Sequence, residues 1–129
     1  MNVDNFLRVV SFDEVARKYS FDDRMLEIVK KLSPARFPQP GPHYDYADLL
    51  EHIRYAIWKI GMCSAERLLE YDLPEIYKRF SRLSSALSEG VRAGIITDEE
   101  YMYATRYLDN LREKFFKEWK ELFEKCVKK

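Results

Sequence analysis

The chain has 129 residues, of which 47% are hydrophobic and 34% are charged, and its 22 basic and 22 acidic residues cancel. A chain of this length supports one hydrophobic core, and a composition this apolar and patterned excludes a disordered protein. Because the net charge is zero, no global field draws the protein to nucleic acid or anionic lipid. Any such attraction has to come from local patches of charge.

Targeting signals are not predicted. No apolar run reaches the roughly 18 to 20 residues of a membrane span, and Asp4 and Arg8 interrupt the place where a signal peptide carries its apolar core. We therefore expect neither a signal peptide nor a transmembrane segment.

The two cysteines, Cys63 and Cys126, are too few and too far apart for a zinc site or a disulfide scaffold. We expect reduced thiols, with a single bridge between helix ends as the alternative. Gln, Asn and Thr together supply only six residues, whereas Glu, Lys and Arg are abundant. This bias is typical of hyperthermophilic proteins.

The first expected unit is a helical arm over residues 1–32. Ser11 and Glu14 form a capping-box pattern before Val15, and Ser20 is placed to open a second helix. The apolar residues of that second helix share one face: Met25, Leu26, Val29 and Leu32. The arm is predicted to consist of two or three short helices.

A proline-rich hinge is predicted over residues 33–43. Its sequence SPARFPQPGP holds four of the five prolines of the chain, and each proline removes a backbone donor and restrains the residue before it. The hinge therefore separates the arm from a helical bundle over residues 44–129.

The bundle is predicted from apolar residues at intervals of three and four. Asp45 is placed to cap its first helix, which Gly61 ends, and a short segment over residues 65–71 leads to the next one. The inward residues of the first helix are Tyr46, Leu49, Leu50, Ile53, Ala56, Ile57 and Ile60.

A helical hairpin completes the bundle. Its first helix starts around Pro74 and ends through Gly90 and Gly94, and Thr97 with Glu100 then forms a capping box for a final helix of about 30 residues. The inward residues of the final helix are Tyr101, Ala104, Leu108, Leu111, Phe115, Trp119, Leu122 and Cys126. No segment alternates with a period of two, so the predicted fold is all-α, with a four-helix-type bundle and a long C-terminal helix.

The polar residues predict no enzyme. Asp48 and His52 could form half of a metal site, but an i, i+4 polar pair explains them equally, and the other histidine, His43, lies in the hinge. No glycine-rich loop precedes a helix, and Ser64 lacks a recognisable base. We therefore expect no catalytic residue, metal, cofactor or small-molecule substrate.

Aromatic residues are numerous and point to self-association. The arm is too short to bury its own aromatic side chains, so it either folds back on the body or docks on another molecule. The final helix is charged and solvated over residues 113–125, but extra apolar residues widen its inward stripe. The candidate self-association residues are Phe6, Phe12, Tyr19, Phe21, Phe116 and Phe123.

Basic residues gather between residues 76 and 96, where four cations are interleaved with serines against the single acid Glu89. The four are Lys78, Arg79, Arg82 and Arg92. Serine hydroxyls and guanidinium groups on one helix suit contact with phosphate. The alternative is that Ser81, Ser84, Ser85 and Ser88 pack closely against a neighbouring helix. The arm adds further candidate phosphate ligands, which are Arg8, Arg17, Lys18, Arg24, Lys30, Lys31 and Arg36.

The order of an apolar and basic arm, a proline hinge over residues 37–42, a bundle and the hairpin AGIITDEEYMYATRYLDNLREKF resembles the major coat proteins of filamentous viruses of hyperthermophilic archaea. The resemblance covers the whole chain as architecture and rests on no short motif. It implies that the arm wraps double-stranded DNA without sequence specificity, and that the protein assembles with itself and with a paralogous coat subunit. It also implies location in a virion or in the cytoplasm of an archaeal host. Zero net charge departs from what coating DNA suggests, although each subunit need neutralise only a few phosphates.

Three functional hypotheses follow. The first is a structural protein that assembles with itself and packages DNA. The second is a small adaptor that binds one protein partner through the arm. The third is a DNA-binding regulator with residues 71–89 as its recognition helix, which would show sequence-dependent affinity.

Overall fold

A computed structural model describes residues 11–33, 41–64 and 71–127, and these residues form five helices and no strand. In chain order the helices are α2 (Phe12–Lys18), α3 (Asp23–Leu32), α4 (Pro42–Gly61), α5 (Leu73–Arg92) and α6 (Asp98–Val127). The predicted all-α class and the long C-terminal helix are confirmed. The start of the arm, most of the hinge and most of the predicted segment at 65–71 lie outside the described residues.

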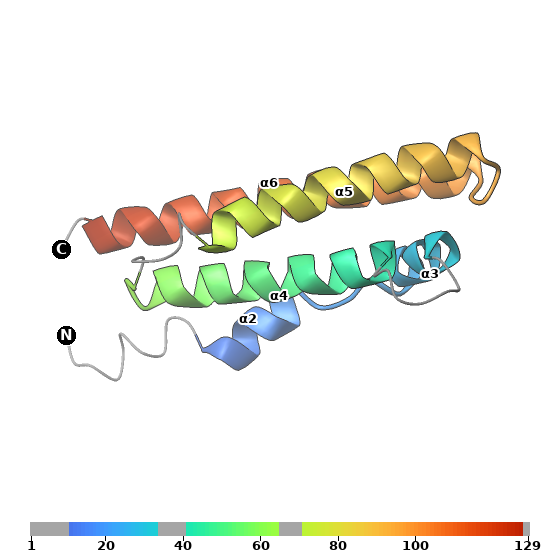
Figure 1. Cartoon of the computed structure of the whole chain (residues 1–129). Helices are drawn as coiled ribbons and strands as arrows, with labels where there is room; N and C mark the ends of the chain where they lie inside the picture. The colour runs from blue at the N-terminus through green and yellow to red at the C-terminus, as the bar shows by residue number, and fades with distance from the viewer. Residues whose placement is uncertain (1–10, 34–40, 65–70, 128–129) are drawn as a thin grey trace.

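Three long helices form the body. Figure 1 shows α5 and α6 side by side as a hairpin above α4, with α2 below α4 and α3 beside the N-terminal end of α4. The second arm helix, α3, packs against α4, α5 and α6, whereas α2 packs against α4. The arm therefore completes the bundle.

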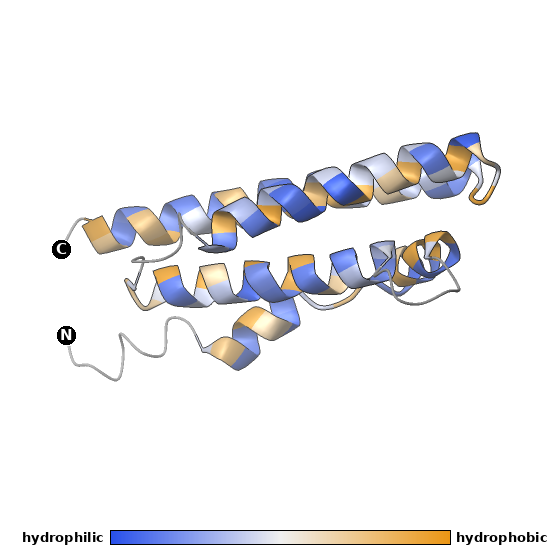
Figure 2. Cartoon of the chain, in the orientation of Figure 1, coloured by the Kyte–Doolittle hydropathy of each residue, from blue (hydrophilic) through white to orange (hydrophobic). Residues whose placement is uncertain are grey.

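The core is built from one apolar stripe of each helix. Orange and blue alternate along every helix in Figure 2, as an amphipathic helix requires. Burying each large apolar side chain stabilises the fold by about 1.5–3 kcal/mol. The fully buried side chains include Met25 and Ile28 from α3, Leu49, Ile53 and Ile57 from α4, Ile76 and Leu83 from α5, and Phe115 from α6.

Two helix starts differ from the prediction. The N-cap of α3 is Asp22, not Ser20, and its carboxylate accepts the Met25 N–H at 2.9 Å. Helix α4 begins at Pro42, inside the predicted hinge, because proline in the first turn has no hydrogen bond to lose. Asp45 consequently lies inside α4 and does not cap it.

Three helix ends match their sequence signals. Ser11 accepts the Glu14 N–H at 3.1 Å. Thr97 and Glu100 form a reciprocal capping box, with distances of 3.0 and 3.1 Å. Gly94 follows α5 with a φ of +75°, a conformation that glycine adopts without strain.

Gly90 does not end α5 as predicted. It lies inside α5, and a Cβ atom at this position would collide with the side chain of Leu32 in α3. The glycine thus lets the arm approach the hairpin closely.

Candidate assembly and nucleic-acid interface

Four aromatic side chains form a cluster on the outside of α5 and α6. This aromatic cluster consists of Tyr77, Phe116, Trp119 and Phe123. The Tyr77 and Phe116 rings lie 5.6 Å apart, and the Trp119 and Phe123 rings stack at 5.3 Å. Tyr77 is 56% exposed and Phe123 is 41% exposed. The cluster is an apolar surface that the described residues cover only in part.

Three of these side chains come from one edge of α6. Phe116 and Phe123 were predicted as a second contact surface, whereas Trp119 was predicted in the core and is only half-buried. Its indole Nε1 is buried and has no hydrogen-bond partner among the described residues. Leaving such a donor unpaired costs about 1–3 kcal/mol, so the buried N–H of Trp119 is a polar group whose desolvation is not compensated. Tyr77 was missed because its own helix gives no sign that it meets Phe116.

The outward face of α5 is basic and rich in serine. We define the serine–basic face as Lys78, Ser81, Arg82, Ser85 and Arg92, all of which are exposed. The inward face of α5 is made by other residues, such as Phe80 and Leu87. The predicted close packing is therefore wrong for Ser81 and Ser85, and also for Ser84, which is exposed as well. The hydroxyls at these positions are exposed toward phosphates, whereas Lys78 lies 3.9 Å from Glu75 and Arg82 binds Asp45 with half of its side chain exposed.

Arg79 does not face a phosphate, which corrects the sequence prediction for this residue. Its side chain is 13% exposed, and its guanidinium bonds to the buried carboxylate of Asp45 and to Asp48, the latter at 2.8 Å. Burial acts to lower the pKa of Arg79, but the hydrogen bonds to the two carboxylates raise its pKa above the ordinary value. Arg82 also binds Asp45, at 3.1 Å, while half of its side chain stays exposed. Arg79 is thus a structural cation between α4 and α5.

The same seam contains the one group of potential metal ligands in the described part of the chain. Asp48, His52 and Glu75 offer ligand atoms within 4.8 Å of one another. However, Nε of Arg79 lies 2.8 Å from Asp48 and 3.5 Å from Glu75, so a guanidinium already supplies the positive charge there. A metal ion could bind only if Arg79 moved away.

His52 continues this network along the seam. Its Nε2 lies 3.5 Å from Asp48, as expected for the predicted i, i+4 pair, and its Nδ1 lies 3.1 Å from Asp72. The second oxygen of Asp72 binds Lys59 at 2.9 Å. The polar residues between α4 and α5 therefore neutralise one another and hold the two helices in register.

The described part of the arm folds back on the body, which is one of the two alternatives that the sequence left open. The Tyr19 hydroxyl donates to Glu118 of α6 at 2.7 Å, and Lys18 pairs with the same carboxylate at 2.6 Å. Arg54 of α4 donates to the Tyr19 carbonyl at 2.9 Å. Tyr19 is 1% exposed, so its predicted role in self-association is wrong for this conformation.

A tyrosine network anchors the second arm helix. Asp22 accepts the Tyr103 hydroxyl at 2.7 Å, and its backbone N–H donates to the Tyr46 hydroxyl at 2.9 Å. The Tyr46 and Tyr107 hydroxyls lie 2.6 Å apart. Burial is the main cause that raises the pKa values of Tyr19, Tyr46 and Tyr107. Ionisation of Tyr19 would remove its donor to Glu118, and ionisation of both Tyr46 and Tyr107 would place two negative oxygens against each other.

The cations predicted on the arm do not share one track. Lys31 pairs with Glu100 at 2.7 Å, and Arg24 lies over the Tyr103 ring at 4.4 Å. The bond to Lys31 is the largest cause that lowers the pKa of Glu100. Arg17 and Lys30 are exposed on different helices. Arg8, Arg36 and Phe6 lie outside the described residues.

Two further predicted contact residues sit on the arm surface. Phe12 packs on Tyr55 of α4 at 5.5 Å between ring centroids, and Phe21 packs on Tyr46 at 5.3 Å. Both phenylalanines keep part of their surface exposed. They could extend a contact surface, but each already has a partner within the chain.

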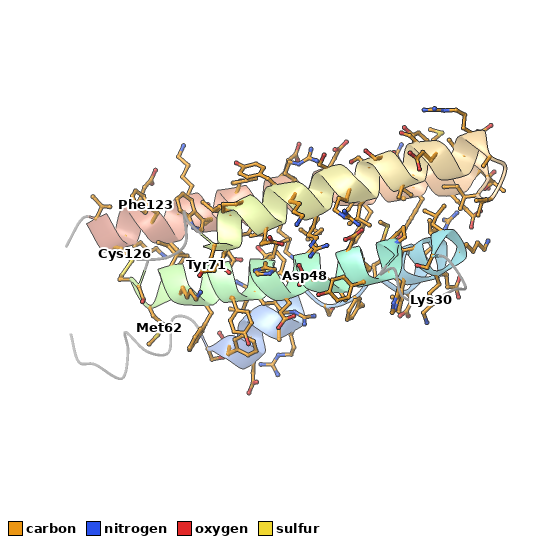
Figure 3. The ribbon with its side chains drawn as sticks, viewed as in Figure 1. Lys30, Asp48, Met62, Tyr71, Phe123 and Cys126 are labelled. Atoms are coloured by element: carbon orange, nitrogen blue, oxygen red, sulfur yellow. A yellow bond between two sulfur atoms is a disulfide. The ribbon has the colours of Figure 1, made fainter. Side chains whose placement is uncertain are left out.

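Cys63 and Cys126 form a disulfide, so the expected reduced thiols are wrong and the alternative bridge is correct. Their Cα atoms lie 5.5 Å apart, because α4 and α6 end side by side. Figure 3 shows Met62, Cys126, Phe123 and Tyr71 at this end of the molecule, Lys30 at the opposite end and Asp48 between them. The aromatic cluster thus lies close to a covalent link.

Comparisons with known proteins assign no family. No protein-family model matches the sequence, and neither the curated proteins nor the solved structures give a significant match. Among the described helices, none combines the length and the apolar character needed to cross a bilayer.

Proposed function

We propose that the protein is a structural subunit that self-associates through the aromatic cluster and acts by binding, not by catalysis. One observation carries the proposal: Tyr77 is 56% exposed and Phe123 is 41% exposed, although each packs against a half-buried aromatic neighbour on α6. Aromatic side chains are enriched at protein–protein interfaces relative to the rest of the surface. Covering it would remove apolar area from water on both partners.

We propose further that the assembly packages double-stranded DNA, as the resemblance to filamentous-virus coat proteins implies. The serine–basic face of α5 supports this role, because its cations and hydroxyls are exposed and suit contacts to the phosphate backbone. Such contacts carry no sequence preference. A coat of this kind would reside in a virion or in the host cytoplasm.

The two other hypotheses receive less support from the described contacts. An adaptor that binds through the arm would have to release α2 from Glu118 and α3 from Tyr103 first. A regulator with α5 as recognition helix would have to read bases with Lys78, Ser81 and Arg82. In that case its affinity would depend on DNA sequence, whereas a coat would bind all duplexes alike.

Sedimentation velocity and electron microscopy, with and without linear duplex DNA, test the proposed function. We expect concentration-dependent association that the double variant Tyr77→Ser/Phe123→Ser abolishes, and filaments on DNA. Ile95→Ser is the matched control, because Ile95 is equally exposed at the turn between α5 and α6 and should leave association unchanged. A wild-type protein that stays monomeric at all concentrations would overturn the proposal.

The DNA role has its own test. The double variant Lys78→Glu/Arg92→Glu should weaken duplex binding, and it should reduce the dependence of affinity on salt, because two phosphate contacts are lost. Self-association should persist. Unchanged DNA affinity in this variant would remove DNA from the proposal and leave the assembly role.

A further inference from the structure

We infer that Cys63 is a modification site for small thiols, and that thiol exchange at its sulfur releases the last turn of α6 and so weakens the aromatic cluster. The first half of this inference concerns the disulfide alone. The second half rests on the proposed self-association and makes it sensitive to redox conditions.

The two sulfurs of the bridge differ in access. Cys63 follows the end of α4 and is exposed, whereas Cys126 lies in the last turn of α6 and is half-buried. A thiolate opens a disulfide by attacking one of its sulfurs, and the rate depends on access to that sulfur. Cys63 is therefore the sulfur that an incoming thiol meets first.

The backbone around Cys63 is held by bonds that do not involve the disulfide. Its φ of +55° lies in the left-handed region that commonly ends a helix. Its N–H donates to the Ile60 carbonyl at 3.0 Å, and the Ser64 N–H donates to the Lys59 carbonyl at 2.8 Å. These bonds cap α4 by themselves. Attack at Cys63 thus requires no unfolding of α4.

The end of α6 lacks such support. Among the described residues after Leu122, only Cys126 is partly buried, and the exposed ones are Phe123, Glu124, Lys125 and Val127. A single helical turn is not stable on its own in water. The bond from Cys126 to Cys63 therefore holds the last turn of α6 against the end of α4.

The exchange is a balanced thiol–disulfide reaction. A small thiolate forms a new sulfur–sulfur bond with Cys63 while the bond to Cys126 breaks, and the electron pair of the broken bond leaves with the Cys126 sulfur. That sulfur takes a proton from water. A second small thiolate can then attack the adduct, which yields the oxidised small thiol and a free Cys63.

The released thiol of Cys126 has only a weak contact to replace the bridge. Its sulfur lies 3.2 Å from the Ile60 carbonyl oxygen, to which the S–H can donate after exchange. A thiol is a weak hydrogen-bond donor. The last turn of α6 is therefore free to fray once the covalent bond is broken.

This turn carries part of the aromatic cluster. Phe123 lies one helical turn before Cys126 and stacks on Trp119 at 5.3 Å between ring centroids. Figure 3 shows Phe123 and Cys126 at the same end of the molecule. When the turn frays, Phe123 loses its fixed place beside Trp119. Opening the bridge should thus weaken any association that uses this ring.

Mass spectrometry after brief reaction with glutathione tests the modification site. We expect a glutathione adduct on Cys63, with Cys126 as the free thiol that N-ethylmaleimide traps. An adduct on Cys126, adducts shared equally between the two cysteines, or no adduct on the folded protein would overturn the assignment of Cys63.

Sedimentation velocity with and without dithiothreitol tests the effect on association. The reduced wild type should associate about tenfold more weakly than the oxidised wild type, as expected for the loss of one aromatic contact at an interface. Phe123→Ser should associate weakly in both redox states, because the ring that reduction releases is already missing. Tyr77→Ser is the matched control, since it weakens the same cluster from α5 and should keep the response to reduction.

Limited digestion with trypsin separates a released turn from a lost fold. The reduced protein should be cut after Lys125 well before it is cut after Lys114, whose ammonium donates to the Lys18 carbonyl. Simultaneous cutting at both sites would overturn the local release.

The outcomes distinguish this inference from the proposed function. Equal association of the oxidised and reduced wild type would overturn the redox control and leave the proposed function standing. An oxidised wild type that stays monomeric would overturn the proposed function, whereas the reaction with glutathione would still decide the modification site.

Discussion

The hydroxyl of Tyr19 donates a hydrogen bond of 2.7 Å to Oε1 of Glu118, and so joins the arm to α6 across 99 positions of sequence. Lys18 binds the other oxygen of the same carboxylate. One side chain of α6 therefore holds the end of α2 in place by two bonds.

Removing this carboxylate should loosen the arm. Glu118→Ala leaves the buried Tyr19 hydroxyl without its acceptor, which should lower the free energy of unfolding by about 1–3 kcal/mol. In the Glu118→Ala protein, the backbone amide hydrogens of α2 should exchange with solvent faster than those of α4. Glu124→Ala, an exposed change on the same helix, should leave exchange in α2 unaltered. Equal protection of α2 in both variants would contradict this role of Glu118.

Gly90 should be sensitive to the smallest added side chain. Gly90→Ala places a methyl group where the Cδ2 methyl of Leu32 now packs, so the Leu32 side chain has to turn away. The lost packing costs about 1–3 kcal/mol, against about 1 kcal/mol that alanine gains over glycine inside a helix. Chemical denaturation measures the loss. Ser85→Ala on the exposed face of α5 should change stability by less than about 0.5 kcal/mol. If Gly90→Ala were as stable as Ser85→Ala, the close approach of Leu32 would not matter.

Arg79 should be far more important for stability than its neighbour Lys78. Arg79→Met leaves the buried carboxylate of Asp45 with only the half-exposed Arg82 as partner, and breaking such a pair costs about 3–5 kcal/mol. Lys78→Met removes an exposed charge and should cost little. Thermal unfolding of the two variants provides the comparison. Similar melting temperatures would mean that Asp45 is satisfied without Arg79.

The protein should lose stability at high pH. Burial raises the pKa values of Tyr19, Tyr46 and Tyr107 above the ordinary 10.0, so the unfolded chain releases protons that the folded chain retains. The stabilisation is complete below about pH 10 and falls as the pH rises toward the folded values. Absorbance at 295 nm should show tyrosines that ionise only as the helices unfold. Ionisation of all tyrosines near pH 10 with intact helix content would contradict this expectation.

Reduction of the disulfide should destabilise the fold strongly. The bridge closes a loop with a sequence separation of 63, and a loop of that size corresponds to about 4 kcal/mol. The double variant Cys63→Ser/Cys126→Ser should therefore unfold at lower denaturant concentration than the oxidised wild type. The reduced wild type is the matched control and should behave like the variant. Identical midpoints for the oxidised and reduced wild type would show that the link adds nothing.

The helices could be predicted because their signals are local. Apolar residues at intervals of three and four mark α4, α5 and α6, and the capping box of Thr97 and Glu100 fixes the start of α6. The start of α4 was misplaced because Asp45 is a good cap by sequence, and only its distant partner Arg79 explains why it is buried inside the helix.

The surface could be predicted only in part. The extra apolar width of α6 indicated Phe116 and Phe123, since both follow from the spacing within one helix. The fate of Tyr19 depends on Glu118, and the exposure of Ser81 depends on which face of α5 the core selects. These outcomes are decided by contacts between segments far apart in sequence, which no local pattern contains.

The bridge between Cys63 and Cys126 has a mechanical consequence. It closes the chain from the end of α4 to the end of α6 into a covalent ring. A force applied to the chain outside Cys63 and Cys126 cannot extend the residues within this ring. Tension applied to the arm would peel away α2 and then α3, whereas tension applied at α6 would pass directly into the ring. In an assembly joined through α6, neighbouring subunits would thus bear load through closed loops, and the arm alone would yield.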